Sequence, residues 1–199
     1  MDASRRCELM TVDELVAAVR ARAQDRSLRT DTPNAKPDLA PLASDEQVAK
    51  AERLLGWALH PLHRALMQAV ANGGFGPGDG FIGLPGGRTD DDGRSVVELR
   101  NALFSNDAIV PGAAPLWDFG CGAWACLESQ WGSVLIVDEY GVTDTQVSLF
   151  DCLVEWVAGN DVSRRLFTFE ERAMTNPFTR QNVTVRTRGR ALGKPYRPA

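Results

Sequence analysis

Hydrophobic positions near the start of the chain recur every three or four residues and predict a helix over residues 11–26. Its apolar face consists of Val12, Leu15, Val16, Val19 and Ala23. Thr11 and Glu14 have the spacing of a capping box, in which each side chain accepts a hydrogen bond from the other residue's backbone N–H. Residues 30–41 contain three prolines and no apolar period, which predicts a surface loop.

The same periodicity predicts two more helices. A second capping box opens at Ser44, and the helix that follows ends near Gly56. Pro61 begins the next helix, because the N–H that proline lacks has no partner in a first helical turn. Asn72-Gly73 ends that helix, since both residue types accept a positive φ. The inward positions are Val48, Ala51, Leu54 and Leu55 in one helix and Leu62, Ala65, Leu66, Ala69 and Val70 in the other.

Half of residues 72–87 are glycine, eight of 16, so no helix or strand is expected there. Gly78, Gly80 and Gly83 match the dinucleotide-binding fingerprint as a string, but that motif needs a strand before it and a helix after it. Here a helix precedes the glycines and Pro85 follows them. We therefore interpret the segment as a tight structural crossing of the chain and expect no nucleotide or other cofactor.

Beyond Gly93 the pattern changes and predicts strands. Two apolar runs, 123–127 and 133–137, are separated by a short link that contains glycine, which predicts a hairpin. The second run is apolar at consecutive positions, as is typical of a central strand covered on both faces. Ser148 then caps a helix that ends at Gly159-Asn160 and whose inward residues are Leu149, Leu153, Trp156 and Val157.

The composition is that of an ordinary globular domain. The 199 residues are 44% hydrophobic and 24% charged, and one domain over residues 1–199 is expected at this length. No apolar run is long enough to predict a membrane span, and the charges within residues 1–20 do not fit a signal peptide. We therefore expect a cytoplasmic protein. A net charge of −4 and a pI near 5.3 argue against general affinity for nucleic acid.

The charge is divided unevenly along the chain. Residues 180–199 carry six basic side chains and no acid, which leaves residues 1–179 with 16 basic and 26 acidic side chains, or −10. This basic tail could fold across its own acidic body or reach for an acidic partner, and charge alone does not decide between the two. Alternating residues over 182–187 favour an edge strand before a frayed end over an arm that binds nucleic acid.

The spacing of the cysteines and histidines in the sequence does not predict a metal site. Cys121 and Cys126 are separated by four residues in an apolar run and are interpreted as buried, reduced thiols; the other cysteines are Cys7 and Cys152. His60 and His63 lack a nearby third ligand and fit a helix start and a packing position. The acidic run 90–92 lacks the spacing of an EF-hand loop and predicts a solvated turn.

Three blocks of the sequence resemble the SUKH superfamily, bacterial proteins related to the yeast cell-wall synthesis regulator. Many of its members are immunity proteins against polymorphic toxins. The blocks lie within residues 44–160 and are Ala51–Gly56 followed by His60-Pro61 and Asn72–Gly78, then Leu116–Gly122 leading into Cys126-Leu127, and finally Ser148–Phe150 with Leu153, Trp156 and Gly159. His60 stands where the family usually has leucine, and the N-terminal helix and the basic tail lie outside the family pattern.

The resemblance implies an α+β fold, in which helices pack against one twisted, mainly antiparallel sheet, and a function in binding rather than catalysis. The residues agree on the second point, because no nucleophile is paired in the sequence with a plausible base. We therefore expect a protein that is not an enzyme. The leading hypothesis is an immunity protein that binds a cognate bacterial toxin directly.

An acidic body of charge −10 would complement a basic toxin domain, because a nuclease must be cationic to hold phosphates. The candidate partner-binding residues are Asp79, Asp90, Asp91, Asp92, Asp118, Asp138 and Glu139. The alternative is a cytosolic regulatory interaction module unrelated to toxins. A small-molecule or enzymatic site at the glycine segment ranks last.

Overall fold

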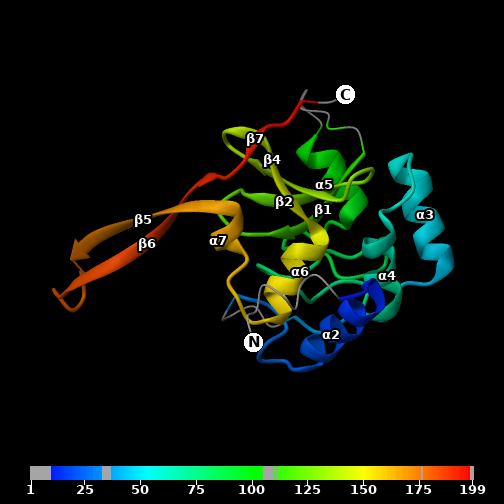
Figure 1. Ribbon diagram of the computed structural model, residues 1–199, viewed down its shortest axis with the longest axis horizontal. Coiled ribbons are helices and arrows are strands. Elements are labelled where there is room, and N and C mark those ends of the chain that lie inside the picture. The colour runs from blue at the N-terminus through cyan, green and yellow to red at the C-terminus, as the bar shows by residue number, and fades with distance from the viewer. Residues whose placement is uncertain (1–9, 33–36, 105–109, 111, 176, 198–199) are drawn as a thin grey trace.

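A computed structural model of the chain describes residues 10–32, 37–104, 110, 112–175 and 177–197. It has an α+β fold with a five-stranded antiparallel sheet and a separate two-stranded sheet (Figure 1). In spatial order the larger sheet consists of β1 (Ala113–Asp118), β2 (Trp124–Glu128), β3 (Ser133–Asp138), β4 (Gly141–Ser148) and β7 (Lys194–Pro195). The predicted fold class, helices packed against a mainly antiparallel sheet, is therefore confirmed.

The helices follow the capping signals of the sequence. Thr11 N–H donates to the Glu14 carboxylate at 2.8 Å, and Ser44 N–H donates to the Gln47 side chain at 2.9 Å, so both predicted capping boxes are formed. Gly56 ends its helix with a φ of +87°. The helices are α2 (Val12–Gln24), α3 (Asp45–Leu55), α4 (Pro61–Ala69), α5 (Val96–Leu103), α6 (Leu149–Val157) and α7 (Ser163–Leu166).

Both faces of the larger sheet are covered at its middle strand, β3. Val134 and Ile136 are fully buried in the main core, which also contains residues of α2, α4 and α6. Leu135, between them, points to the opposite face and packs with Phe104 and Val110 in a second cluster. The prediction of a central strand covered on both faces is confirmed, and so is the hairpin that joins β2 to β3.

The sequence analysis missed one helix and placed three side chains wrongly. Residues 96–103 form helix α5, although the chain after Gly93 was expected to be rich in strands, because Ser95 and Glu98 build a third capping box that was overlooked. Cys121 is exposed in the β1–β2 turn, where its φ is +53°, whereas Cys126 is buried as predicted; Cys152 is buried as well. Val12 and Leu54 are 47% and 56% exposed, because each lies at the solvent border of its helix's apolar face. Cys7 lies outside the described residues.

The second sheet is a long hairpin that extends away from the rest of the molecule (Figure 1). It consists of β5 (Phe167–Thr175) and β6 (Asn182–Ala191), and we call residues 167–191 the hairpin arm. β6 confirms the strand predicted over 182–187, whereas β5 was not predicted. The frayed end expected after that strand is wrong, because β6 continues to Ala191 and β7 then pairs with β4. Within the basic tail, Arg188 donates to the carbonyl oxygens of Phe119 at 2.7 Å and Gly120 at 2.5 Å. The base of the tail therefore folds against its own body.

Candidate functional site

The glycine segment is compact because its chain passes close to Asn72 twice. A Cβ atom on Gly83 would lie 2.3 Å from the Asn72 carbonyl oxygen, and one on Gly87 would lie 2.3 Å from the Asn72 side chain. The Asn72 amide oxygen accepts the Leu84 N–H at 2.8 Å. Residues 72–87 form no helix and no strand beyond a single bridge between Thr30 and Gly76. The predicted structural crossing is confirmed.

This crossing places Asp79 beside the end of β1. Asp79 N–H donates to the Asp118 carbonyl at 3.1 Å, and Ile82 N–H donates to the Leu116 carbonyl at 2.8 Å. A Cβ atom on Gly78 would lie 2.2 Å from the same Asp118 carbonyl oxygen. The close approach requires glycine, and it holds two carboxylates from distant parts of the chain side by side.

Four of the seven predicted acidic residues line one small cleft. Asp79, Asp90, Asp91 and Asp118 surround a volume of about 30 Å³ together with Arg88, Thr89 and Trp124. We call this group of residues the acidic cleft. A volume of this size has room for about one water molecule and none for a side chain.

Asp118 is the half-buried acid of the acidic cleft, and the pKa of its carboxyl group is raised. Burial raises the pKa of its carboxyl group, and the negative charges of Asp79 and Asp91 raise it further. A hydrogen bond from Gly120 N–H at 2.6 Å and the charge of Arg188 act in the opposite direction. A cationic partner group would stabilise the ionised form, so the acidic cleft has an electrostatic reason to attract one.

Asp90 has a structural role in addition to its charge. Its side chain is 3% exposed and accepts the Arg94 backbone N–H at 2.7 Å, and its carboxylate forms an ion pair with the Arg94 guanidinium at 2.7 Å. Asp92, which is 72% exposed, pairs with the same guanidinium at 2.7 Å. Both acids are therefore partly neutralised within their own turn, whereas Asp91 has no ion pair among the described residues.

Asp138 and Glu139 do not join the acidic cleft. Asp138 is the last residue of β3 and Glu139 lies in the turn to β4, where the Asp138 carboxylate accepts the Tyr140 N–H at 2.9 Å. Asp118 is paired with Trp124, and Trp124 is paired with Val137, so this turn lies at the same end of the sheet as Asp118. The structure thus gathers the predicted acids at one end of the sheet but divides them between two loops.

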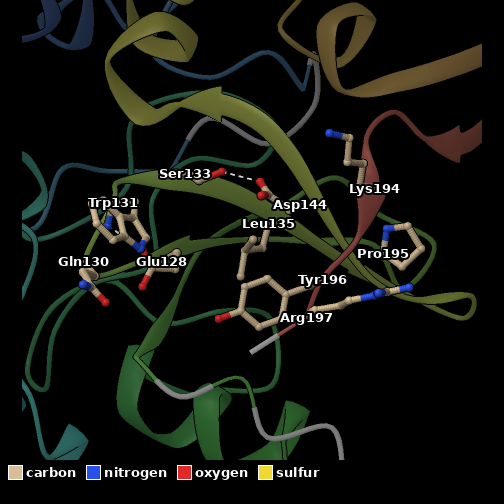
Figure 2. A pocket seen from close by; sticks show the side chains of 10 residues that line it. All are labelled: Glu128, Gln130, Trp131, Ser133, Leu135, Asp144, Lys194, Pro195, Tyr196 and Arg197. Atoms are coloured by element: carbon tan, nitrogen blue, oxygen red, sulfur yellow. Dashed lines mark hydrogen bonds between the residues drawn. The ribbon is translucent and has the colours of Figure 1, made fainter. Parts of the chain in front are cut away.

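A larger depression, which the sequence analysis missed, opens at the other end of the sheet. Its volume is about 740 Å³, and Figure 2 shows Leu135 at its centre with Trp131 on one side and Pro195 and Arg197 on the other. We call it the edge hollow, and it is lined by Glu128, Gln130, Trp131, Ser133, Leu135, Asp144, Lys194, Pro195, Tyr196 and Arg197. Trp131 is 77% exposed, whereas Leu135 is fully buried.

Hydrogen bonds fix the polar wall of the edge hollow. The Glu128 carboxylate accepts the Trp131 backbone N–H at 2.5 Å, and the Asp144 carboxylate accepts the Ser133 hydroxyl at 2.5 Å. The other wall is β7, a strand of two residues that pairs with Thr143 and Asp144 of β4. A strand of two residues has no periodic pattern from which it could be predicted. The one signal for the hollow in the sequence was Trp131 beside Gly132 in a turn.

The two histidines have structural positions, one at a helix start and one in the core. His63 is completely buried, and burial lowers its pKa to about 4. The His60 side chain accepts the Leu62 N–H at 3.3 Å at the start of α4. Within these described parts of the chain, no group of three or more His, Cys, Asp or Glu residues is arranged to hold a metal ion. The predicted roles of both histidines, at a helix start and in packing, are confirmed.

None of the helices in the described ranges has the length and apolar character needed to cross a bilayer. A comparison with models of known protein families finds no match, and a comparison with curated proteins finds none either. The resemblance to the SUKH superfamily therefore stays a prediction that rests on the sequence blocks alone.

Proposed function

We propose that the chain is a non-catalytic binding protein of the immunity type, which acts in the cytoplasm and neutralises a basic bacterial toxin by direct contact. The acidic cleft is the proposed centre of the contact surface. Asp79 comes from the glycine segment, Asp91 from the following turn and Asp118 from the end of β1. Their convergence on one spot is the observation that carries the proposal.

The energetics of the cleft favour a cationic partner. Asp118 is half-buried and lies near two other carboxylates, so its ionised form is destabilised in the free protein. An arginine or lysine of a partner would relieve this repulsion, and complementary charge would also accelerate association. The same arrangement disfavours phosphate-bearing ligands, because like charges repel at short distance.

The experiment measures binding of the purified chain to the toxin domain encoded next to its gene, with association and dissociation rates followed at low and at high salt. A triple variant, Asp79→Asn, Asp91→Asn and Asp118→Asn, should reduce the association rate at low salt by about tenfold or more. A matched control, Asp13→Asn with Glu46→Gln, removes exposed acids from α2 and α3 and should change the rate little.

The proposal also predicts protection of cells. Co-expression of the chain should rescue growth of cells that make the toxin, and the triple variant should rescue it less well. Equal binding by the triple variant and by wild type at low salt would contradict the role of the acidic cleft. Absence of binding and of protection, together with capture of an unrelated cytosolic protein, would favour the regulatory module instead.

A further inference from the structure

The outer part of the hairpin arm exposes apolar side chains on one face. Met174 of β5 lies directly opposite Val183 of β6 in the strand register, and they are 54% and 38% exposed. Val185 is two residues further along β6 and therefore belongs to the same face. Phe178, in the turn that joins the strands, is 94% exposed. An apolar stripe of this kind is typical of a surface that contacts another macromolecule.

The arm also lacks support from its own body. Among the described residues, the arm contacts the body near its base, where Phe167 packs in the main core, Arg188 reaches the β1–β2 loop and Arg190 lies 4.8 Å from the Tyr140 ring centre. Beyond the base, both of its strands are exposed on both faces. A two-stranded ribbon is marginally stable in water, so a second surface against the outer arm would stabilise it.

A complementary surface is present on the same chain, outside the arm. The arm is rooted beside Phe119 and Tyr140, whereas the edge hollow extends from Glu128 and Trp131 along the sheet edge to β7, the short strand that follows the arm. Because the arm extends outward from its root (Figure 1), its tip does not meet the hollow of its own chain. A second copy can bring the two together.

Chemistry and charge both fit that pairing. Phe178 and Trp131 are the most exposed large hydrophobic side chains in the described parts of the chain, and aromatic side chains dominate the energetic centres of interfaces. Residues 167–191 carry five basic and two acidic side chains, or +3, and the rest of the chain carries 17 basic and 24 acidic, or −7. The edge hollow itself is lined by two acidic side chains, Glu128 and Asp144, and two basic ones, Lys194 and Arg197. The attraction is therefore between the arm and the other copy's body as a whole, and it is not local to the hollow.

We propose that two copies of the chain form a dimer by exchanging hairpin arms, with the tip around Phe178 seated in the partner's edge hollow against Trp131 and Tyr196. The two contacts are equivalent by two-fold symmetry, as is usual for homodimers. The described residues of the outer arm, 172–175 and 177–185, are 13, and with the nine hollow residues other than the buried Leu135 they make 22 per side, within the roughly 20–30 of a standard interface. The residues of the acidic cleft are not part of the proposed dimer contact.

Sedimentation equilibrium of the full chain over a wide concentration range tests the dimer. Wild type should be dimeric, and both Phe178→Ser and Trp131→Ser should raise the dimer dissociation constant by at least about tenfold. Leu54→Ser is the matched control, because Leu54 is 56% exposed on α3, away from both surfaces, and it should leave the constant unchanged. Circular dichroism checks that each variant is folded.

Mixing the two variants tests the contact itself. The Trp131→Ser chain keeps an intact arm and the Phe178→Ser chain keeps an intact hollow, so a mixed dimer regains one complete contact. The mixture should associate more tightly than either variant alone. A wild type that stays monomeric, a dimer that survives Phe178→Ser unchanged, or a mixture no tighter than its components would each overturn the proposal.

Discussion

The Cα of Gly78 faces the carbonyl oxygen of Asp118 so closely that a Cβ atom would lie 2.2 Å from it. Gly78 also has a φ of +57°, a conformation that side chains rarely adopt. This contact holds the glycine segment against the end of β1, next to Asp79. It is the point at which backbone geometry decides the position of the acidic cleft.

Replacing Gly78 by alanine should lower the free energy of unfolding by more than about 2 kcal/mol, since the added methyl group strains φ and meets a backbone carbonyl that cannot rotate away. Gly93→Ala is the control, because Gly93 also has a positive φ but no atom within 4 Å of an added Cβ. It should lower the free energy by about 1 kcal/mol. Urea titration measures both, and equal losses would contradict the close approach.

Arg188→Ala should loosen the base of the hairpin arm. The change removes two charge-assisted hydrogen bonds to backbone carbonyls and should lower the free energy of unfolding by about 1–3 kcal/mol. Arg172→Ala, which removes an exposed ion pair with Glu170, should cost under about 1 kcal/mol. Hydrogen exchange of the β1–β2 loop should accelerate in the first variant and not in the second.

The stability of the protein should fall in mild acid because of His63. Its folded pKa of about 4 is below the unfolded value of 6.5, so the unfolded chain binds more protons between these pH values. The stabilisation is complete above pH 6.5 and declines by about 1.4 kcal/mol for each pH unit as the pH falls toward 4.

His63→Leu isolates this contribution. Neither ring nitrogen of His63 has a hydrogen-bond partner in the described structure, so leucine should be tolerated near neutral pH and should remove the histidine's share of the acid slope. The raised pKa of Asp118 acts with the opposite sign and is common to both proteins. Equal slopes for wild type and variant, measured by denaturant unfolding at several pH values, would show that His63 is not buried.

Thiol labelling should distinguish the exposed Cys121 from the buried Cys126 and Cys152. In a Cys7→Ser background, Cys121 should react in the native state because it is exposed. Cys126 and Cys152 should react only on unfolding, since both are buried, and burial raises the pKa of the Cys152 thiol to about 12. Mass spectrometry counts the labels, and more than one label on the native protein would contradict the described packing.

The local signals in the sequence predicted the helices well and the strands in part. Thr11, Ser44 and Pro61 marked helix starts correctly, because capping depends on residues only a few positions apart. β5 was missed because its outer residues are exposed on both faces and show no apolar alternation. β7 was missed because two residues carry no pattern.

The candidate site was likewise predicted only in part from the sequence. Acidic residues in loops could be recognised individually, but the meeting of Asp79 with Asp118 depends on hydrogen bonds between segments almost 40 positions apart in sequence order. The edge hollow depends on Lys194 and Tyr196 returning to the sheet beside β4, which no local pattern of the tail reveals. Tertiary contact, rather than residue type, defines both surfaces.

The hydrogen bonds of Arg188 have one more consequence. They tie the root of the arm to the carbonyl groups of Phe119 and Gly120, directly after the half-buried Asp118. A macromolecule that displaces the arm must either break these hydrogen bonds or move the β1–β2 loop together with the arm. Binding of such a macromolecule to the arm would then alter the proton affinity of Asp118. The arm and the acidic cleft would be thermodynamically coupled although no ligand touches both.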